Sequence, residues 1–192
     1  MSNRKLIKTK LTGFSLMEVI VSTAIFVIVI LSMTGIFKMV VDAQRQAIAS
    51  QNVEESLRYF LEVISKEIRM AQKNGGQCPH ISHSSIFGLA SNELGDILYL
   101  RNYHDDCISY SLVNDNGVNR FSVSKSSLTG MAFTTWLSPR RVNISELHFT
   151  VHEEVDGQAY VTINLSANYV GKEAGRSKMR VQTSISSRHY RP

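Results

Sequence analysis

The pattern of hydrophobic and polar positions changes twice in the first part of the chain. A basic leader at residues 1–13 is followed by an apolar run from Phe14 to Phe37, in which Glu18 is the single charged residue. As a helix rising about 1.5 Å per residue, this run would extend roughly 36 Å, enough to cross a hydrocarbon core of about 30 Å. The run is longer than a secretory signal core and no small-residue cleavage site follows it. We therefore predict a membrane-spanning helix.

Beyond the apolar run, hydrophobic residues recur every three or four positions, which is the stripe of an amphipathic helix. The stripe consists of Val53, Leu57, Leu61, Ile64, Ile68 and Ala71. It predicts one continuous helix of about 60 residues that ends at Asn74-Gly75-Gly76, before Pro79. A freestanding coiled coil is the alternative, and the β-rich sequence that follows argues against it.

From residue 80 the period changes to the alternation that is typical of strands. Residues 80–95 are predicted to form a loop with a short apolar element at Ile86–Leu89. Six strands are expected in an antiparallel sheet, with one face on the helix stripe and the other in water. They are Asp96–Tyr103, Cys107–Val113, Val118–Ser124, Ile144–His152, Tyr160–Val170 and Lys178–Ser187. The turn-like connectors between the last three strands favour a meander for them.

The predicted fold class is therefore α+β, a long N-terminal helix packed on an antiparallel sheet. Four regions are expected: a leader at 1–13, a membrane-spanning half of the helix at 14–39, an amphipathic half at 40–75, and a β-rich domain at 76–192. The leader carries four basic residues and no acidic one. Positive charge before the span predicts a cytoplasmic N-terminus and an exported C-terminal domain on a single-pass inner-membrane protein.

Glu18 is out of place in a plain membrane anchor. A charge inside a span costs roughly 2.5–3.5 kcal/mol on insertion scales, so such residues usually have a partner and a function. Gly13 stands at the boundary between the leader and the apolar run. The string Gly13-Phe14-Ser15-Leu16-Met17-Glu18-Val19, with its basic leader and the helix after it, resembles the N-terminal signal of type IV prepilins and pseudopilins.

This resemblance implies that a prepilin peptidase cuts after Gly13 and that the same enzyme N-methylates the new N-terminus at Phe14. Glu18 becomes the fifth residue of the mature chain and pairs with the α-amino group of Phe14 in a neighbouring subunit. Because a buried unpaired charge is costly, the pair would set the register of the filament. The resemblance also implies a pilin-like fold, other pilins as partners, and an assembly ATPase and membrane platform that act from outside this chain.

A narrower resemblance concerns the type of subunit. The segment Leu57–Gln72 and the late strand patterns are similar to minor subunits grouped as PulJ, GspJ or PilW-like. The expected function is therefore that of a minor pilin or pseudopilin that helps initiate or cap a type IV pilus or a type II secretion pseudopilus. A major filament subunit and a single-pass membrane-anchored ligand-binding protein are the alternatives. Pilus function, secretion and DNA uptake are all left open.

The two cysteines, Cys78 and Cys107, both fall in the predicted exported part, where oxidising conditions favour a disulfide. A zinc site is the alternative, since His80 and His83 lie near Cys78 while His104 and Asp106 lie near Cys107. Neither spacing matches a strong zinc motif, and a disulfide would consume both thiolates.

Other candidate chemistry is weak. His148 and His152 with Glu153 lie on a predicted strand, whereas the zinc-protease signature needs a helix with the glutamate directly after the first histidine. Asn114–Gly117 is too short for a calcium loop and predicts a hairpin turn. The sequence contains no nucleophile elbow and no phosphate-binding or dinucleotide-binding glycine loop. We therefore expect neither an enzyme nor a cofactor.

The net charge of +5 and the pI near 9.3 raise the question of nucleic acid binding. Arg4, Lys5, Lys8 and Lys10 lie in the leader, however. Removing these four of the 21 basic residues would leave 17 against 16 acidic residues. Overall charge therefore indicates no nucleic acid partner for the mature chain.

Overall fold

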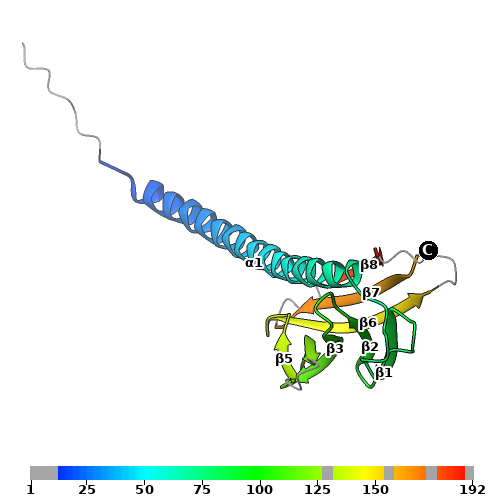
Figure 1. Cartoon of the computed structure of the whole chain (residues 1–192). Coiled ribbons are helices and arrows are strands. Elements are labelled where there is room, and N and C mark those ends of the chain that lie inside the picture. The colour runs from blue at the N-terminus through cyan, green and yellow to red at the C-terminus, as the bar shows by residue number, and fades with distance from the viewer. Residues whose placement is uncertain (1–12, 127–131, 154–157, 172–176, 189–192) are drawn as a thin grey trace, which may run out of the picture. The chain divides into compact units, whose positions relative to one another are not determined.

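The computed structural model describes residues 13–126, 132–153, 158–171 and 177–188, so the predicted leader up to residue 12 lies outside the described residues. The chain divides into two compact units at Gln44 and Arg45. One helix, α1 (Leu16–Arg69), runs through this boundary, and strands follow it (Figure 1). The long helix and the antiparallel strands confirm the predicted α+β class.

Eight strands follow α1 in the described residues, and they form two antiparallel sheets rather than the single sheet expected, while the meander predicted for the last three strands is present. The five-stranded sheet has the order β1-β2-β3-β4-β5, and the three-stranded sheet has the order β6-β7-β8. The five-stranded sheet comprises β1 (Phe87–Asn92), β2 (Gly95–Arg101), β3 (Cys107–Asp115), β4 (Val118–Ser126) and β5 (Ala132–Trp136). The three-stranded sheet comprises β6 (Val142–His152), β7 (Tyr160–Tyr169) and β8 (Met179–Ser186).

All six predicted strands are present, with ends displaced by a few residues at most. The expected loop at 80–95 instead contains β1, which pairs along its whole length with β2. The sequence pattern does not predict β5 either, because its five residues are all exposed and show no alternation of burial. These two short strands complete the edges of the five-stranded sheet.

The helix ends at Arg69, earlier than the predicted stop at Asn74-Gly75-Gly76. The N–H of Met70 is shared between the carbonyls of Lys66 and Glu67, each at 3.2 Å, which tightens the last turn. The Gln72 N–H then donates to the carbonyl of Arg101 at 2.8 Å, so the chain pairs with the end of β2. Pairing with the sheet therefore replaces the final helical turn.

The core of the second unit lies between the later part of α1 and both sheets. Phe60 is fully buried and stacks on Phe121 with ring centroids 3.6 Å apart, while Tyr110 meets it edge-on at 6.4 Å. The predicted stripe is correct except at Leu61, which is only partly buried; Phe60 occupies the centre instead. Burying each such side chain stabilises the fold by about 1.5–3 kcal/mol. The stripe faces Leu98, Leu100, Leu112, Phe121, Ile144, Leu147, Ile163 and Leu165, among others.

The hairpin between β3 and β4 turns at Asn116 and Gly117, where the sequence predicts a turn. Both residues have positive φ, 54° and 84°, which is the backbone of a two-residue type I′ turn. Asp115 and Val118 close the hairpin as its last registered pair. Glycine is needed at the second turn position because side chains strain this conformation.

Candidate functional site

The predicted cleavage bond lies directly before the helix. Gly13, Phe14 and Ser15 are outside α1, and the Ser15 carbonyl accepts hydrogen bonds from the N–H groups of Glu18 at 3.0 Å and Val19 at 3.2 Å. Ser15 is therefore the N-cap residue of the helix. Gly13 and Phe14 are both exposed, and a Cβ placed at Gly13 would have no atom of the described residues within 4 Å.

Glu18 lies in the first turn of α1, exposed, three residues after the N-cap. A carboxylate here is stabilised by the positive end of the helix dipole, by about 0.3–1 kcal/mol at exposed sites. The order Ser15-x-x-Glu18 also matches the capping-box pattern of helix starts. Glu18 therefore has a favourable position within its own helix, in addition to any role towards a neighbour.

The apolar part of α1 presents its side chains outward. Within the first unit, Phe26 is 64% exposed and Leu31 is 67% exposed, and none of the most hydrophobic 18-residue window is buried within the chain. The hydroxyl groups here are satisfied locally. Ser22, Thr23, Ser32 and Thr34 each donate to the carbonyl four residues earlier, at 2.7–2.9 Å. This helix is long and apolar enough to span a membrane.

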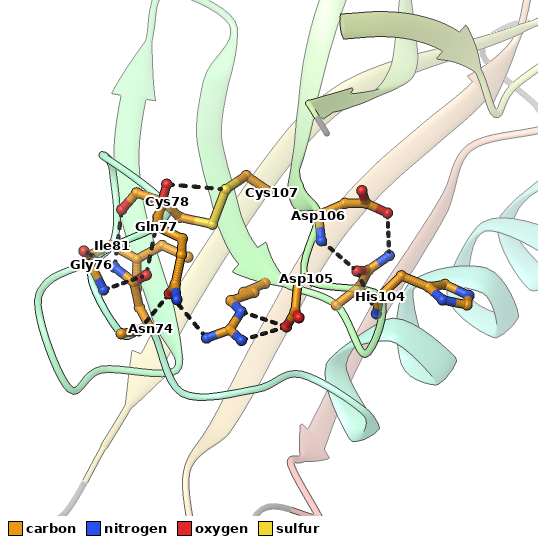
Figure 2. The surroundings of a disulfide bond; sticks show 12 residues. Asn74, Gly76, Gln77, Cys78, Ile81, His104, Asp105, Asp106 and Cys107 are labelled. Carbon is orange, nitrogen blue, oxygen red and sulfur yellow. Dashed lines mark hydrogen bonds and ion pairs between the residues drawn. A yellow bond between two sulfur atoms is a disulfide. The ribbon is translucent and has the colours of Figure 1, made fainter. Parts of the chain in front are cut away.

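A disulfide joins Cys78 to Cys107, with a Cα–Cα distance of 5.6 Å (Figure 2). It ties the loop after α1 to the first residue of β3. Asn74, which is buried, organises the same loop. Its Nδ2 donates to the carbonyls of Cys78 at 3.0 Å and Ile81 at 2.6 Å, while its Oδ1 accepts from the N–H groups of Gly76 and Cys78. The loop is thus fixed by one covalent bond and one buried amide.

The residues of the alternative zinc site are not brought together. The ring of His80 stacks on Tyr99 at 4.5 Å, and His104 points away from the disulfide (Figure 2). Asp106 Oδ2 instead forms an ion pair with Lys125 Nζ at 2.7 Å. Among the described residues, no three His, Cys, Asp or Glu side chains form a metal-binding group, and His83 joins none. Because both cysteines are bridged, neither offers a thiolate.

The other polar motifs have structural roles. Glu153 Oε1 accepts hydrogen bonds from the N–H groups of Ile86 at 2.9 Å and Phe87 at 2.8 Å, which satisfies the start of β1. His148 Nδ1 lies 3.3 Å from Asp96 Oδ2, and His152 stacks on Tyr160 at 4.4 Å. These histidines and Glu153 therefore do not converge on one point.

The sequence pattern does not indicate two electrostatic features of the second unit. Glu67, on the last turns of α1, has a raised carboxyl pKa because burial penalises its charge, and its Oε2 atom is buried without a hydrogen-bond partner among the described residues. Burial also raises the pKa of the Tyr110 hydroxyl, and the nearby Glu67 carboxylate raises it further to a smaller extent. The burial of Glu67 and Tyr110 depends on the packing of α1 on β3, which the sequence pattern does not show.

Asp115 is the opposite case. A hydrogen bond from Arg120 holds its pKa below the ordinary value, and Arg140 adds to the effect. Arg120 Nη1 lies 2.7 Å from Asp115 Oδ2, and its guanidinium also donates to the carbonyl of Ser138 and covers the ring of Trp136 at 4.4 Å. This network connects the end of the β3–β4 hairpin to Trp136, Ser138 and Arg140.

Comparisons with family models, curated proteins and solved structures found no match to this chain. Any assignment of function therefore depends on the N-terminal motif, the exposed apolar helix and the chemistry of the β-rich part. The N-terminal motif and the apolar helix support the function proposed next. The chemistry of the β-rich part supports a separate inference.

Proposed function

We propose that this protein is a subunit of a type IV pilus or of a type II secretion pseudopilus, with a role in initiating or capping the filament as a minor pilin or pseudopilin. The observation that carries the proposal is the N-terminal segment, where the Gly13–Phe14 bond precedes a helix with an acidic residue in its first turn and apolar side chains on all its faces. The α+β architecture is compatible with this function.

The glycine at position 13 supports cleavage by a prepilin peptidase. The described residues set no requirement for glycine there, since a Cβ at this position would have none of their atoms within 4 Å and the backbone is not in the left-handed region. A small residue before the scissile bond is consistent with recognition by such an enzyme. The leader carries the positive charge that would keep this bond in the cytoplasm.

Glu18 supports assembly through the helices. Cleavage after Gly13 would create a positive α-amino group at Phe14, four residues before the Glu18 carboxylate. In a bundle of apolar helices, each carboxylate needs a cation, and the amino group of a neighbouring subunit supplies one. Because leaving either charge unpaired in an apolar environment costs several kcal/mol, the pair would favour a single axial register.

The exposed apolar half of α1 has two successive environments in this proposal. Before assembly it lies in the inner membrane; afterwards it packs against other pilins in a filament in the periplasm or at the cell surface. An assembly ATPase and a membrane platform would drive the transfer. The locally satisfied hydroxyls of Ser22 and Ser32 suit both environments, because neither leaves a donor unpaired.

The decisive test is the N-terminus of the mature protein. The full chain would be expressed with and without a prepilin peptidase, extracted from membranes and analysed by intact mass and N-terminal sequencing. The proposal predicts a chain that begins at N-methylated Phe14 only when the enzyme is present. A chain that still begins at Met1 in the presence of an active peptidase would contradict it and favour a membrane-anchored protein.

Assembly is tested separately with Glu18→Ala. We expect this variant to be cleaved and methylated but to be lost from sheared filaments in cells that express the partner pilins. Asp42→Ala, which removes the next acidic residue of the same helix, is the matched control and should assemble normally. The amount of the protein relative to other subunits in those filaments distinguishes a minor from a major subunit.

A further inference from the structure

The outer face of the five-stranded sheet carries a groove of about 540 Å³ that no part of the proposed filament function uses. Its floor is one row of residues aligned across four strands. Tyr99 on β2 pairs with Ser109 on β3, Ser109 pairs with Ser124 on β4, and Ser124 pairs with Thr134 on β5. Residues in register on one face of a sheet point the same way, so the row places an aromatic ring at one end and three hydroxyls beyond it.

The disulfide-linked loop forms one wall of this groove. Gln77, Pro79 and His80 line it, and the His80 ring stacks on Tyr99 with centroids 4.5 Å apart. The loop lies directly on the sheet at Gly88, the partner of Tyr99 in β1, where a Cβ would be 2.1 Å from the carbonyl oxygen of His80. A side chain at position 88 would therefore displace the disulfide-linked loop from the sheet.

The lining is almost uncharged and combines apolar surface with hydroxyl groups. The hydroxyls of Ser124 and Thr134 lie 2.8 Å apart, and each keeps further capacity to donate or accept. Lys125, the one Lys or Arg among the described lining residues, forms an ion pair with Asp106 at 2.7 Å. No carboxylate is among the described residues that line the groove. A ligand that matches this lining is neutral, rich in hydroxyl groups and partly apolar on one face.

We propose that this groove binds a neutral oligosaccharide. The stacked rings of Tyr99 and His80 offer an aromatic platform for the C–H face of a pyranose, since the face of an aromatic ring is electron-rich and attracts polarised C–H groups. The hydroxyl row then offers donors and acceptors to the sugar hydroxyls along the strand-to-strand direction. The volume falls in the range of roughly 300–1,000 Å³ that is usual for ligand sites. The proposal is independent of filament assembly.

Binding is tested on the full-length protein in dodecyl-N,N-dimethylamine oxide, a detergent without a sugar headgroup, by isothermal titration calorimetry. The probes are maltohexaose, cellohexaose and chitohexaose. We expect at least one of them to bind with a Kd of about 1 mM or tighter, and Tyr99→Ala to weaken that binding about tenfold. No binding of any of the three at concentrations up to about ten times that Kd would overturn the proposal.

A matched pair of threonine variants locates the site. Thr134→Val removes a floor hydroxyl and keeps the shape of the side chain, whereas Thr162→Val does the same on the other sheet, where Thr162 Oγ1 lies 2.9 Å from Ser184 Oγ. The proposal predicts weaker binding for Thr134→Val and unchanged binding for Thr162→Val. Equal effects of the two variants, or no effect of Thr134→Val and Tyr99→Ala, would overturn it.

Two charged probes check the chemical class. A heparin-derived hexasaccharide and a 12-nucleotide single-stranded DNA are titrated under the same conditions. Binding of the neutral sugars in preference to both supports the proposal. Binding of either charged probe with sensitivity to Thr134→Val, in the absence of neutral sugar binding, would overturn it and assign the groove to an anionic polymer.

Discussion

The first unit of the chain and the second use the same apolar residue types in opposite ways. Phe26, in the exposed part of α1, leaves 64% of its surface uncovered, whereas Phe60, further along the same helix, is completely buried. The second unit covers its own hydrophobic residues with two sheets, whereas the described residues of the first leave the apolar stretch of α1 exposed. Under the proposed function, lipid or other subunits cover this stretch, so changes there should affect membrane insertion or assembly rather than the stability of the β-rich part.

The largest expected effect compares these two phenylalanines. Phe60→Ala removes a ring that stacks on Phe121 at 3.6 Å and leaves a cavity in the core, so we expect a loss of about 3–5 kcal/mol in the free energy of unfolding. Phe26→Ala should change that free energy by less than about 0.5 kcal/mol, as exposed substitutions do. Urea unfolding of both variants in detergent, followed by near-ultraviolet circular dichroism, measures the difference. Similar losses for the two variants would show that the first unit contributes to the stability of the second.

The next effect concerns the disulfide, which has no counterpart in the first unit. Cys78 and Cys107 are 29 residues apart in sequence. Closing a loop of this size contributes about 3–4 kcal/mol on the chain-entropy model, so Cys78→Ser with Cys107→Ser should lower the free energy of unfolding by about 2–4 kcal/mol. Unfolding with and without reductant checks this for the natural chain. A reduced protein as stable as the oxidised one would contradict the prediction.

The sequence predicted what depends on local pattern and missed what depends on how strands are placed. The helix stripe around Val53, Leu57 and Ile64 and the Asn116-Gly117 turn could be predicted because periodicity and turn residues are local signals. The meander of β6, β7 and β8 could be predicted from its turn-like connectors. The division into two sheets could not, since the alternation along β6 does not say whether it also pairs with a strand of the five-stranded sheet. The strand β1 was hidden because Phe87–Asn92 has only two buried residues, both at its start.

The same limit applies to the candidate sites. Gly13, Phe14 and Glu18 could be proposed from the sequence because the resemblance to a processing motif is a local pattern along the chain. The row of Tyr99, Ser109, Ser124 and Thr134 could not, because these residues are joined only by strand register, and a shift of one residue would move them to the other face. Glu67 likewise needs the packing of α1 on β3 before its burial is evident.

A smaller effect, of opposite sign in the two units, is expected for two glycines. Gly117 has a φ of 84°, so Gly117→Ala should destabilise the second unit by about 1–2 kcal/mol. Gly35 lies inside α1, which continues through it, and a Cβ there would have nothing within 4 Å. Gly35→Ala should therefore stabilise the helix locally by about 0.5–1 kcal/mol. Amide hydrogen exchange around each position measures both; slower exchange around residue 117 in Gly117→Ala would refute the turn assignment.

The smallest effect is a pH dependence that arises in the second unit. Burial raises the pKa of Glu67, so the folded chain holds this proton more tightly than the unfolded chain. The stabilisation from that proton is fully present below the unfolded pKa of about 4.3 and is lost as the pH rises through the folded value. Relative to Glu67→Gln, the natural chain should therefore gain stability as the pH falls from neutral towards that region.

Asp115 supplies a control of opposite sign, because its pKa is lowered by the hydrogen bond from Arg120. Its contribution is present above the unfolded pKa and is lost as the pH falls through the folded value, so the natural chain should lose stability relative to Asp115→Asn on acidification. Urea unfolding of the three proteins between about pH 2 and pH 7 separates the two groups, since every other titration cancels in each difference. If Glu67→Gln and Asp115→Asn shift the pH profile in the same direction, the burial of Glu67 is not what controls its proton. The packing of α1 on β3 would then have to be looser than the structure shows.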